Sequence, residues 1–211
     1  MLRYSMGLFL ASVAIGISAQ TSDHGKPVVK VGEVATYAVN LRADNRLAEE
    51  TVTITSVDDK LIKYITARSD RTPADMEGVS TAEWSTIQSG SSGSRFDPSY
   101  PRLKFPLVVG ETWKGKYEVT GLSGARSKAD IDFKVVAKEQ VTTPAGTYEA
   151  FKVESSGWVT GVSWQGSFRT TNTTWYAPAI HRIVKSELKD YRNNRLWNDT
   201  VTELKSFKPA P

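Results

Sequence analysis

The chain has 211 residues, with 27 Lys and Arg against 23 Asp and Glu, a formal net charge of +4 and no cysteine. Without cysteine, disulfides and thiolate metal ligands are excluded, so the fold must rest on side-chain burial and backbone pairing. The basic residues are interspersed with acidic ones, which is typical of solvated faces and argues against a nucleic-acid partner.

The first 19 residues differ in character from the rest. Arg3 precedes an apolar run over 6–17, and the small residue Ala19 follows shortly after. This is the pattern of a cleavable signal peptide, and the run is shorter than the ~20 residues of a membrane-spanning helix. We therefore expect a signal peptide at 1–19 with cleavage after Ala19, and a flexible leader at 20–26. The mature protein is expected to be periplasmic or secreted, without a transmembrane segment and without a lipid on a lipoprotein cysteine.

Alternating apolar and polar residues predict strands in the first half of the chain. The ranges 36–41, 51–55 and 61–65 alternate and are rich in β-branched residues, which suit a half-buried pleated surface. The range 79–88, which contains Trp84, is predicted as one further strand.

A Gly-, Ser- and Pro-rich stretch at 89–106 separates the two halves. Its first part, 89–94, has the composition of a flexible segment, and Pro98 and Pro106 argue against a central strand. Neither half alone has enough strands for a stable core. We therefore interpret 89–106 as a long connection within a single all-β domain over 27–208, in preference to a linker between two domains.

The second half alternates more clearly. The ranges 113–119 and 131–135 each place apolar residues on one face, and Thr143-Pro144-Ala145-Gly146 predicts a hairpin turn before a return strand at 148–153. Trp158, Trp164 and Phe168 share one parity over 157–169, which predicts a single long strand bent at its glycines.

The stretch 180–192 would also fit one face of a helix, so its type stays open between strand and helix. A hairpin turning at Asn193-Asn194 is the preferred interpretation. Val31-Gly32-Glu33 and Val109-Gly110-Glu111 each precede the first strand of a half and suggest two similar halves. Together these patterns predict an all-β, antiparallel fold of about ten strands in a curved half-barrel or a sandwich-like sheet.

Three segments carry a resemblance to a known family. They are Phe-Pro-Leu-Val-Val-Gly-Glu-Thr-Trp at 105–113, Thr-Thr-Pro-Ala-Gly-Thr-Tyr at 142–148 and Thr-Trp-Tyr-Ala-Pro at 174–178. Their order and spacing resemble the TapB-like family of exported bacterial proteins of unknown function, over roughly residues 100–206. Residues 179–185 depart from the family pattern, in which glycines precede a Val-Lys strand. The resemblance implies an all-β sheet and a periplasmic or secreted location, and it brings no catalytic residues.

The chain offers few groups for catalysis or metal binding. Its two histidines, His24 and His181, are far apart, and there is no Gly-x-Ser-x-Gly motif, so no serine-hydrolase site, zinc site or cofactor is expected. Asp130 and Asp132 share one strand face and are the only candidates for a carboxylate pair that acts as acid and base or holds a cation. The alternation that buries Ile131 turns them toward solvent.

Six tryptophans are the most distinctive feature. Trp113, Trp158 and Trp164 fall on predicted apolar strand faces, where they form part of the core or line a concave groove. In the second case they would hold a lipid chain or stack on sugar rings, with Gln165 and Arg169 as polar neighbours. These five residues are the predicted ligand site.

Three functions follow, in order of preference. The first is an exported, non-catalytic domain that binds an apolar or amphipathic, lipid-like ligand on its aromatic sheet face. The second is a structural or interaction protein of the cell envelope, without a small-molecule ligand, that contacts a protein partner through a mildly basic surface and the segment 185–195. The third is a polysaccharide-active enzyme that depends on Asp130 and Asp132.

Overall fold

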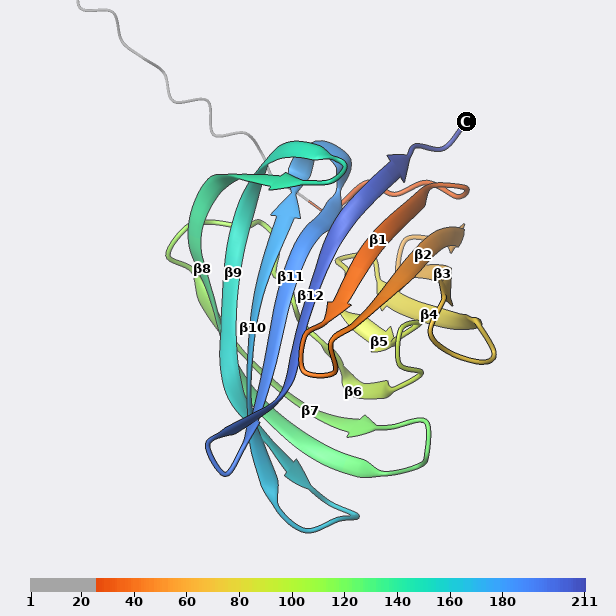
Figure 1. Ribbon diagram of the computed structural model, residues 1–211. Coiled ribbons are helices and arrows are strands. Elements are labelled where there is room, and N and C mark those ends of the chain that lie inside the picture. The colour runs from red at the N-terminus through yellow and green to blue at the C-terminus, as the bar shows by residue number, and fades with distance from the viewer. Residues whose placement is uncertain (1–25) are drawn as a thin grey trace, which may run out of the picture.

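A computed structural model describes residues 26–211 as a closed barrel of twelve antiparallel strands (Figure 1). The predicted signal peptide and all but the last residue of the predicted leader lie outside the described residues. The elements in chain order are β1 (Val34–Leu41), β2 (Arg46–Val57), β3 (Leu61–Arg68), β4 (Asp75–Thr81), β5 (Thr86–Gln88), β6 (Arg95–Tyr100), β7 (Thr112–Thr120), β8 (Arg126–Thr143), β9 (Gly146–Gly161), β10 (Ser167–Ala177), the 3-10 helix η1 (Pro178–Ile180), β11 (Arg182–Arg192) and β12 (Arg195–Lys208).

The barrel is an up-and-down meander that closes on itself. Each strand pairs with its neighbours in sequence, and β1 also pairs with β12 from Val34↔Lys208 to Leu41↔Thr200. The all-β, antiparallel prediction is therefore confirmed, and the predicted half-barrel or sandwich-like sheet of about ten strands is wrong. Period-two alternation shows which residues share a face, but it carries no information on which strand edges meet. Closure satisfies the backbone groups that an open sheet leaves unpaired at its edges.

Two predictions about the first half need correction. The range 79–88 forms two strands, because Trp84 adopts a left-handed conformation (φ 61°) between β4 and β5. The predicted connection at 89–106 contains β6, although Pro98 lies within it. Proline is tolerated there because β6 pairs with β7 only from Arg95↔Thr120 to Asp97↔Glu118.

The second half also departs from the prediction at one hairpin. The range 157–169 is not one bent strand: β9 ends at Gly161, a turn follows, and β10 begins at Ser167. By contrast, the preferred hairpin after residue 180 is confirmed. Strand β11 ends in a turn whose residues Asn193 and Asn194 both have positive φ, 50° and 59°, as short hairpin turns require.

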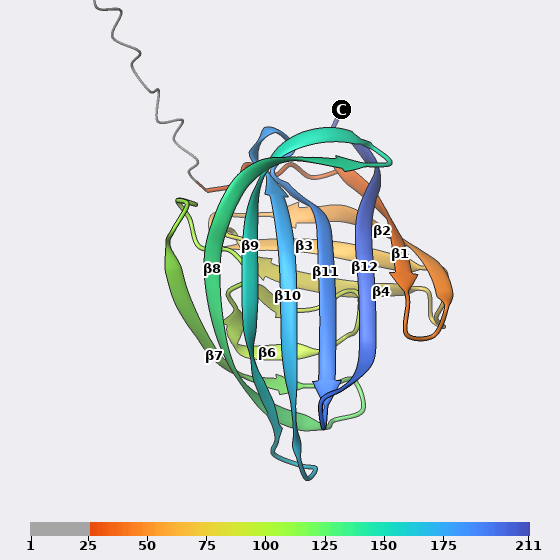
Figure 2. The same ribbon diagram turned by 60° about the vertical axis from the view of Figure 1, so that its left-hand side comes forward.

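The two halves of the barrel differ in strand length (Figure 2), and we call β1–β6 the short-stranded half and β7–β12 the long-stranded half. Strands β9 to β12 stand side by side on the near side, while the shorter β3, β4 and β6 run across behind them. The β8–β9 hairpin curls over one end of the barrel. There Ala145 N donates to the Leu204 carbonyl (3.1 Å) and Trp175 Nε1 donates to Glu139 Oε1 (2.8 Å).

The main hydrophobic core belongs to the long-stranded half. Strand β8 alternates strictly, so that Ala129, Ile131, Phe133 and Val135 are all buried. They pack with buried residues of β9, β10 and the β6–β7 connection, namely Phe151, Val153, Tyr176, Leu103 and Leu107. A smaller cluster in the short-stranded half comprises Val29, Ile54 and Ile62.

Two turns in the barrel are built alike. Gly32 N donates to the Ile54 carbonyl (2.9 Å) and Ile54 N to the Glu33 carbonyl (3.0 Å). In the second half, Gly110 N donates to the Val135 carbonyl (2.8 Å) and Val135 N to the Glu111 carbonyl (3.0 Å). Ile54 and Val135, the buried partners in these two turns, each lie directly before a bulge in their strand. The two Val-Gly-Glu segments thus make equivalent backbone connections in the two halves.

Candidate functional site

The interior of the barrel contains a half-open cavity of about 440 Å³ between the short-stranded half and strands β10–β12. This volume is in the usual range for small-molecule sites, roughly 300–1,000 Å³. We call this space the lumen. Its wall includes five aromatic side chains, Tyr37, Tyr64, Trp84, Phe96 and Tyr100, and three charged ones, Glu50, Arg102 and Arg182.

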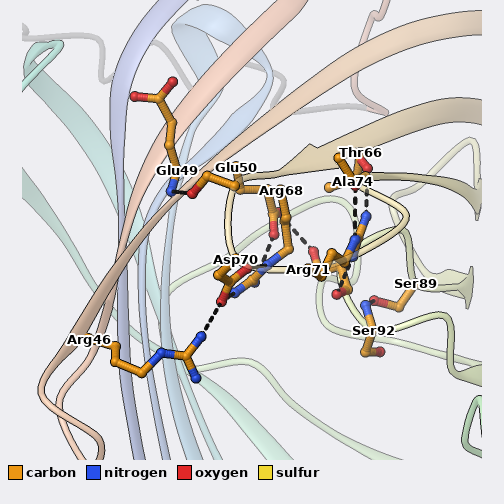
Figure 3. Close-up of polar contacts among 12 residues, drawn as sticks. Arg46, Glu49, Glu50, Thr66, Arg68, Asp70, Arg71, Ala74, Ser89 and Ser92 are labelled. Carbon is orange, nitrogen blue, oxygen red and sulfur yellow. Dashed lines mark hydrogen bonds and ion pairs between the residues drawn. The ribbon is translucent and has the colours of Figure 1, made fainter.

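An ion-pair network fixes the wall of the lumen at β2 and β3 (Figure 3). Arg68 Nη1 lies 3.1 Å from Glu50 Oε2, and Arg68 Nε and Nη2 each lie 2.9 Å from an oxygen of Asp70. Ser91 Oγ donates to the other Glu50 oxygen at 2.8 Å. The hydrogen-bonded Arg68 guanidinium lowers the pKa of the Asp70 carboxyl. Both carboxylates are therefore held in fixed positions by one arginine.

A second arginine ties three segments together beside this network. Arg71 Nη2 donates to the Thr66 carbonyl (2.6 Å), Nε to the Ala74 carbonyl (2.9 Å) and Nη1 to the Ser91 carbonyl (2.6 Å). These bonds attach the serine-rich loop at 89–94 to strand β3. Composition predicted a flexible loop there, and the structure shows that it carries specific hydrogen bonds.

Two tyrosines present hydroxyl groups to the lumen. Tyr37 donates to the Ile183 carbonyl at 3.1 Å, and removal from water raises the pKa of Tyr37 to about 12. Burial likewise raises the pKa of Tyr64. Because burial disfavours the phenolate, both rings stay neutral near physiological pH and combine an apolar face with a hydroxyl.

Trp84 and Arg182 form one end of the lumen. The left-handed conformation of Trp84 places its ring where Nε1 donates to the His181 carbonyl (3.2 Å) and the Arg182 guanidinium lies 4.8 Å from the ring centroid. Arg182 is only 4% exposed and forms an ion pair with Glu33 at 2.6 Å. Burial lowers the pKa of Arg182, and Glu33 opposes that shift.

Arg102 brings a further positive charge into the lumen. It belongs to the β6–β7 connection, which is anchored by the buried Leu103 and Leu107, and its guanidinium lies 5.2 Å from the Tyr100 ring centroid. Its charge acts to lower the pKa values of tyrosines on β1, β3 and β7, which places it near all three strands. Within residues 26–211, no carboxylate forms an ion pair with Arg102.

A second cavity of about 230 Å³ adjoins the lumen and shares Phe96, Tyr100, Asn172 and Leu188 with it. Its remaining wall is mostly apolar and includes Tyr117, Val159 and Phe168. The rings at the junction pack closely, with 5.8 Å between the centroids of Phe96 and Tyr100 and 5.3 Å between those of Tyr100 and Tyr117. The interior therefore changes from charged near Arg102 to mostly apolar beyond the aromatic junction, where Asp190 is the one charged residue of the wall.

The five residues of the predicted ligand site are not brought together, and none of them lines the lumen. Trp113 stacks on Phe133 at 5.2 Å and donates from Nε1 to the Pro101 carbonyl (2.8 Å). Trp158 is 56% exposed, next to a shallow depression that includes Asp130. A ligand role for these residues stays a prediction.

The other three lie at or near the turn between β9 and β10. Trp164 stacks on Phe168 at 6.3 Å, with the Arg192 guanidinium 5.4 Å from its ring, and Gln165 is an exposed neighbour. Arg169 borders an outer depression of about 820 Å³ that also includes Trp113 and several charged side chains. The parity argument failed here because the turn at 162–166 separates residues that it placed on one strand.

The candidate carboxylate pair lies on the outer face. Asp130 and Asp132 are each held by a lysine, at 3.0 Å from Lys116 and 2.7 Å from Lys114. In the described part of the chain, no group of three or more His, Cys, Asp or Glu side chains is arranged to hold a metal ion. Lys185, in the predicted interaction segment, is paired with Glu187 (3.3 Å) and Glu203 (3.0 Å).

The lumen residues were missed for identifiable reasons. Trp84 lay within a range predicted as one strand, and Arg102 lay between prolines in a stretch predicted as a connection. Arg182 begins β11 directly after His181, whose φ is 53°. Burial of a charged side chain such as that of Arg182 runs against the usual expectation for arginine, so composition alone gave no signal for it.

Comparison with known families gives one match. Residues 119–201, from the end of β7 to the middle of β12, match a family model described as DUF3108-like. This match covers only the long-stranded half of the barrel, so it is a similarity of part of the chain. The finer resemblance to the TapB-like family stays a prediction. No curated protein shows significant sequence similarity to the chain.

Solved structures share the fold over nearly the whole chain. A Bacteroides fragilis protein described as a "putative exported protein with YmcC-like fold" matches with a TM-score of 0.58 and 18% identity, over 87% of this chain and 99% of its own. A "putative lipoprotein" from Parabacteroides distasonis matches with a TM-score of 0.57 and 15% identity, over 88% and 98%. The "hypothetical lipoprotein YmcC" of Escherichia coli has a TM-score of 0.44 and 12% identity, over 84% and 85%. At these identities the first two matches establish the shared fold.

Among the described residues, no helix combines the length and the apolar character needed to cross a bilayer.

Proposed function

We propose that the protein is an exported, non-catalytic binding protein that encloses an amphipathic small molecule in the lumen of its barrel. The observation that carries this proposal is the cavity of about 440 Å³, with its mixed aromatic, hydroxyl and charged wall and an adjoining apolar cavity of about 230 Å³. A barrel whose only role was structural would be expected to fill its interior with side chains.

Export is supported by two independent observations. The apolar run at 6–17, bounded by Arg3 and Ala19, has the pattern of a signal peptide. Two proteins that share the fold are described as an exported protein and a lipoprotein. The proposed place of action is therefore the periplasm or the exterior of the cell.

The lumen supports a ligand better than the outer aromatic residues do. Outside, Trp158 lies near the Lys116–Asp130 ion pair, and the Trp164 ring is already covered by Arg192. Inside, aromatic and polar side chains line one half-open cavity. Convergence of a few polar groups in an apolar cavity is what orients a small molecule.

The test is a pair of cavity-filling variants. Ser186 on β11 lines the lumen, whereas Ser156 on β9 is exposed and borders the outer depression of Trp113 and Arg169. Binding of N-phenyl-1-naphthylamine, a neutral fluorescent apolar probe, is measured for the mature chain and for Ser186→Phe and Ser156→Phe. Circular dichroism confirms that each variant is folded.

We expect Ser186→Phe to weaken probe binding at least about tenfold, since the added ring occupies the lumen, and Ser156→Phe to leave it unchanged. Loss of binding in Ser156→Phe alone would place the site at the outer residues. Failure of the unmodified chain to bind the probe or any decyl-chain compound would contradict the proposal.

A further inference from the structure

The lumen holds an unusual concentration of buried polar atoms without hydrogen-bond partners. Within residues 26–211, four buried side-chain atoms without a hydrogen-bond partner belong to residues of the lumen wall: Thr66 Oγ1, Arg102 Nε, Asn172 Oδ1 and Arg182 Nε. Only one other such atom, Asp199 Oδ1, occurs in the described part of the chain. Buried polar groups are almost always hydrogen bonded, and leaving one unpaired is destabilising. Four of the five residues that carry such atoms line this one cavity, so its wall contains polar groups that the protein itself does not fully pair.

The charges of the lumen indicate the sign of that ligand. Glu50 is neutralised by Arg68, at 3.1 Å, and Arg182 by Glu33, at 2.6 Å. Arg102 has no carboxylate partner among the described residues and keeps an uncompensated positive charge. Arg102 is half-buried, and a guanidinium that is partly removed from water is stabilised by an accompanying anion. An acidic group would also accept hydrogen bonds from the Arg102 guanidinium, whose planar fork of donors matches carboxylate and phosphate geometry.

The surroundings of Arg102 indicate what the acidic group is attached to. Its guanidinium lies over Tyr100, and Tyr100 belongs to the ring array that leads into the mostly apolar second cavity. At the far side of that cavity, the buried Asp190 accepts a hydrogen bond from Asn198 Nδ2 at 2.8 Å. Asp190 is separated from Arg182 by roughly 26 Å of β11. A second acidic group on the ligand would meet its negative charge.

We propose that the ligand of the lumen is an amphipathic anion with one acidic group, of carboxylate or phosphate type, at Arg102 and an apolar tail beyond the aromatic junction. This inference rests on the proposed function, because it names the ligand class of the same cavity. Arg182, Thr66 and Asn172 line the same cavity.

The experiment compares ligands that differ only in their head group. Decanoate, decyl phosphate and decanol are titrated against the mature chain loaded with N-phenyl-1-naphthylamine, and displacement of the probe is measured. We expect at least one of the two anions to bind about tenfold or more tightly than decanol, which corresponds to one charge-assisted hydrogen bond. The anion that binds better identifies the type of acidic group. Acetate and inorganic phosphate, which lack the tail, are expected to displace nothing at the same concentrations.

Matched arginine variants locate the effect. Arg102→Gln is expected to abolish the preference for the anion and to keep probe binding, whereas Arg169→Gln, on the outer face, is expected to keep both. An unchanged preference in Arg102→Gln would overturn the inference. If Arg102→Gln does not fold, the ratio of decanoate to decanol affinity in the unmodified chain alone tests whether the lumen prefers an anionic head group. Equal binding of decanol and both anions would overturn the anionic head group and leave the binding lumen intact, while absence of all binding would overturn both.

Discussion

The two halves of the barrel differ in the length of their strands and in the contacts that hold them. Strands β8–β12 are long, and β8 alternates so regularly that four apolar side chains in succession are buried on one face. Strands β3–β6 are short and joined by loops held by side-chain hydrogen bonds from Arg68 and Arg71. The long-stranded half supplies most of the apolar core, and the short-stranded half supplies most of the polar wall of the lumen.

This difference shows where stability and recognition reside. The alternating face of β8 supplies much of the apolar core, and Ala129 and Ile131 on this face also line the second, mostly apolar cavity. The short strands leave a cavity in the interior, and its wall is held by specific polar contacts. We therefore expect substitutions in the apolar core to act mainly on stability and those in the lumen to act mainly on binding.

The largest loss of stability is expected for Phe133→Ala. Phe133 is 2% exposed, stacks on Trp113 at 5.2 Å and lies in the main core. Removing a buried phenylalanine ring lowers the free energy of unfolding by about 3–5 kcal/mol, which urea denaturation measures. Trp158→Ala is the control on the same sheet, and its effect is expected to be far smaller because Trp158 is 56% exposed. Equal losses in the two variants would contradict the assignment of the core.

The ion-pair network of the short-stranded half is expected to come next. Arg68→Met leaves Glu50, which is 11% exposed, without an ion-pair partner, and leaves Asp70, which is 15% exposed, with Arg46 alone at 3.6 Å. An unpaired, largely buried carboxylate is strongly destabilising, and we expect a loss of about 2–3 kcal/mol by chemical denaturation. Arg46→Met is the matched control, because Arg46 is 55% exposed and lies 3.6 Å from Asp70. A loss as large in Arg46→Met would show that burial does not decide the effect.

The same substitution in either of the two equivalent turns should lower stability by the same amount. Gly32 and Gly110 have φ of 88° and 96°, and a Cβ added at either would meet no close contact. Each Gly→Ala substitution should therefore lower stability through backbone strain alone, by about 1–2 kcal/mol. Gly→Asn should be milder at both sites, since Asn tolerates positive φ better. Clearly unequal losses at the two positions would show that the turns are not equivalent in energy.

Alkaline pH should lower the free energy of unfolding through the tyrosines of the lumen. Because the pKa of Tyr37 is raised to about 12 in the folded protein, its contribution is fully present below pH 10. Above pH 10 the unfolded chain ionises first, so the free energy of unfolding falls as the pH rises toward 12. Urea denaturation at pH 9 and pH 11 should show a smaller fall for Tyr37→Phe than for the unmodified chain. An identical fall in both would contradict the desolvation of Tyr37.

The smallest effect is expected on the outer face. Asp130 and Asp132 form ion pairs with lysines whose side chains are about two-thirds exposed, and exposed pairs contribute little to stability. The double variant Asp130→Asn/Asp132→Asn should leave the denaturation midpoint unchanged within error. A large shift in the midpoint would contradict the expectation that these exposed ion pairs contribute little to stability.

Regular strands could be predicted from the sequence, and the site could not. The alternation at 131–135 and the turn at Asn193-Asn194 are local signals, and the structure has both. Closure between β1 and β12 joins residues from the two ends of the chain, which no local pattern specifies. Trp84, Arg102 and Arg182 converge from a left-handed turn, a proline-rich connection and a strand start. Each is ordinary in its own segment, and their meeting depends on the closed barrel.

The central claim is that the lumen holds an amphipathic molecule. Native mass spectrometry of the mature chain, purified without denaturant from its own compartment, tests this most directly. We predict an added mass that solvent extraction removes and that is absent from Ser186→Phe but present in Ser156→Phe. A mass equal to that of the polypeptide alone in every sample, even after addition of excess decanoate and decanol, would contradict the claim.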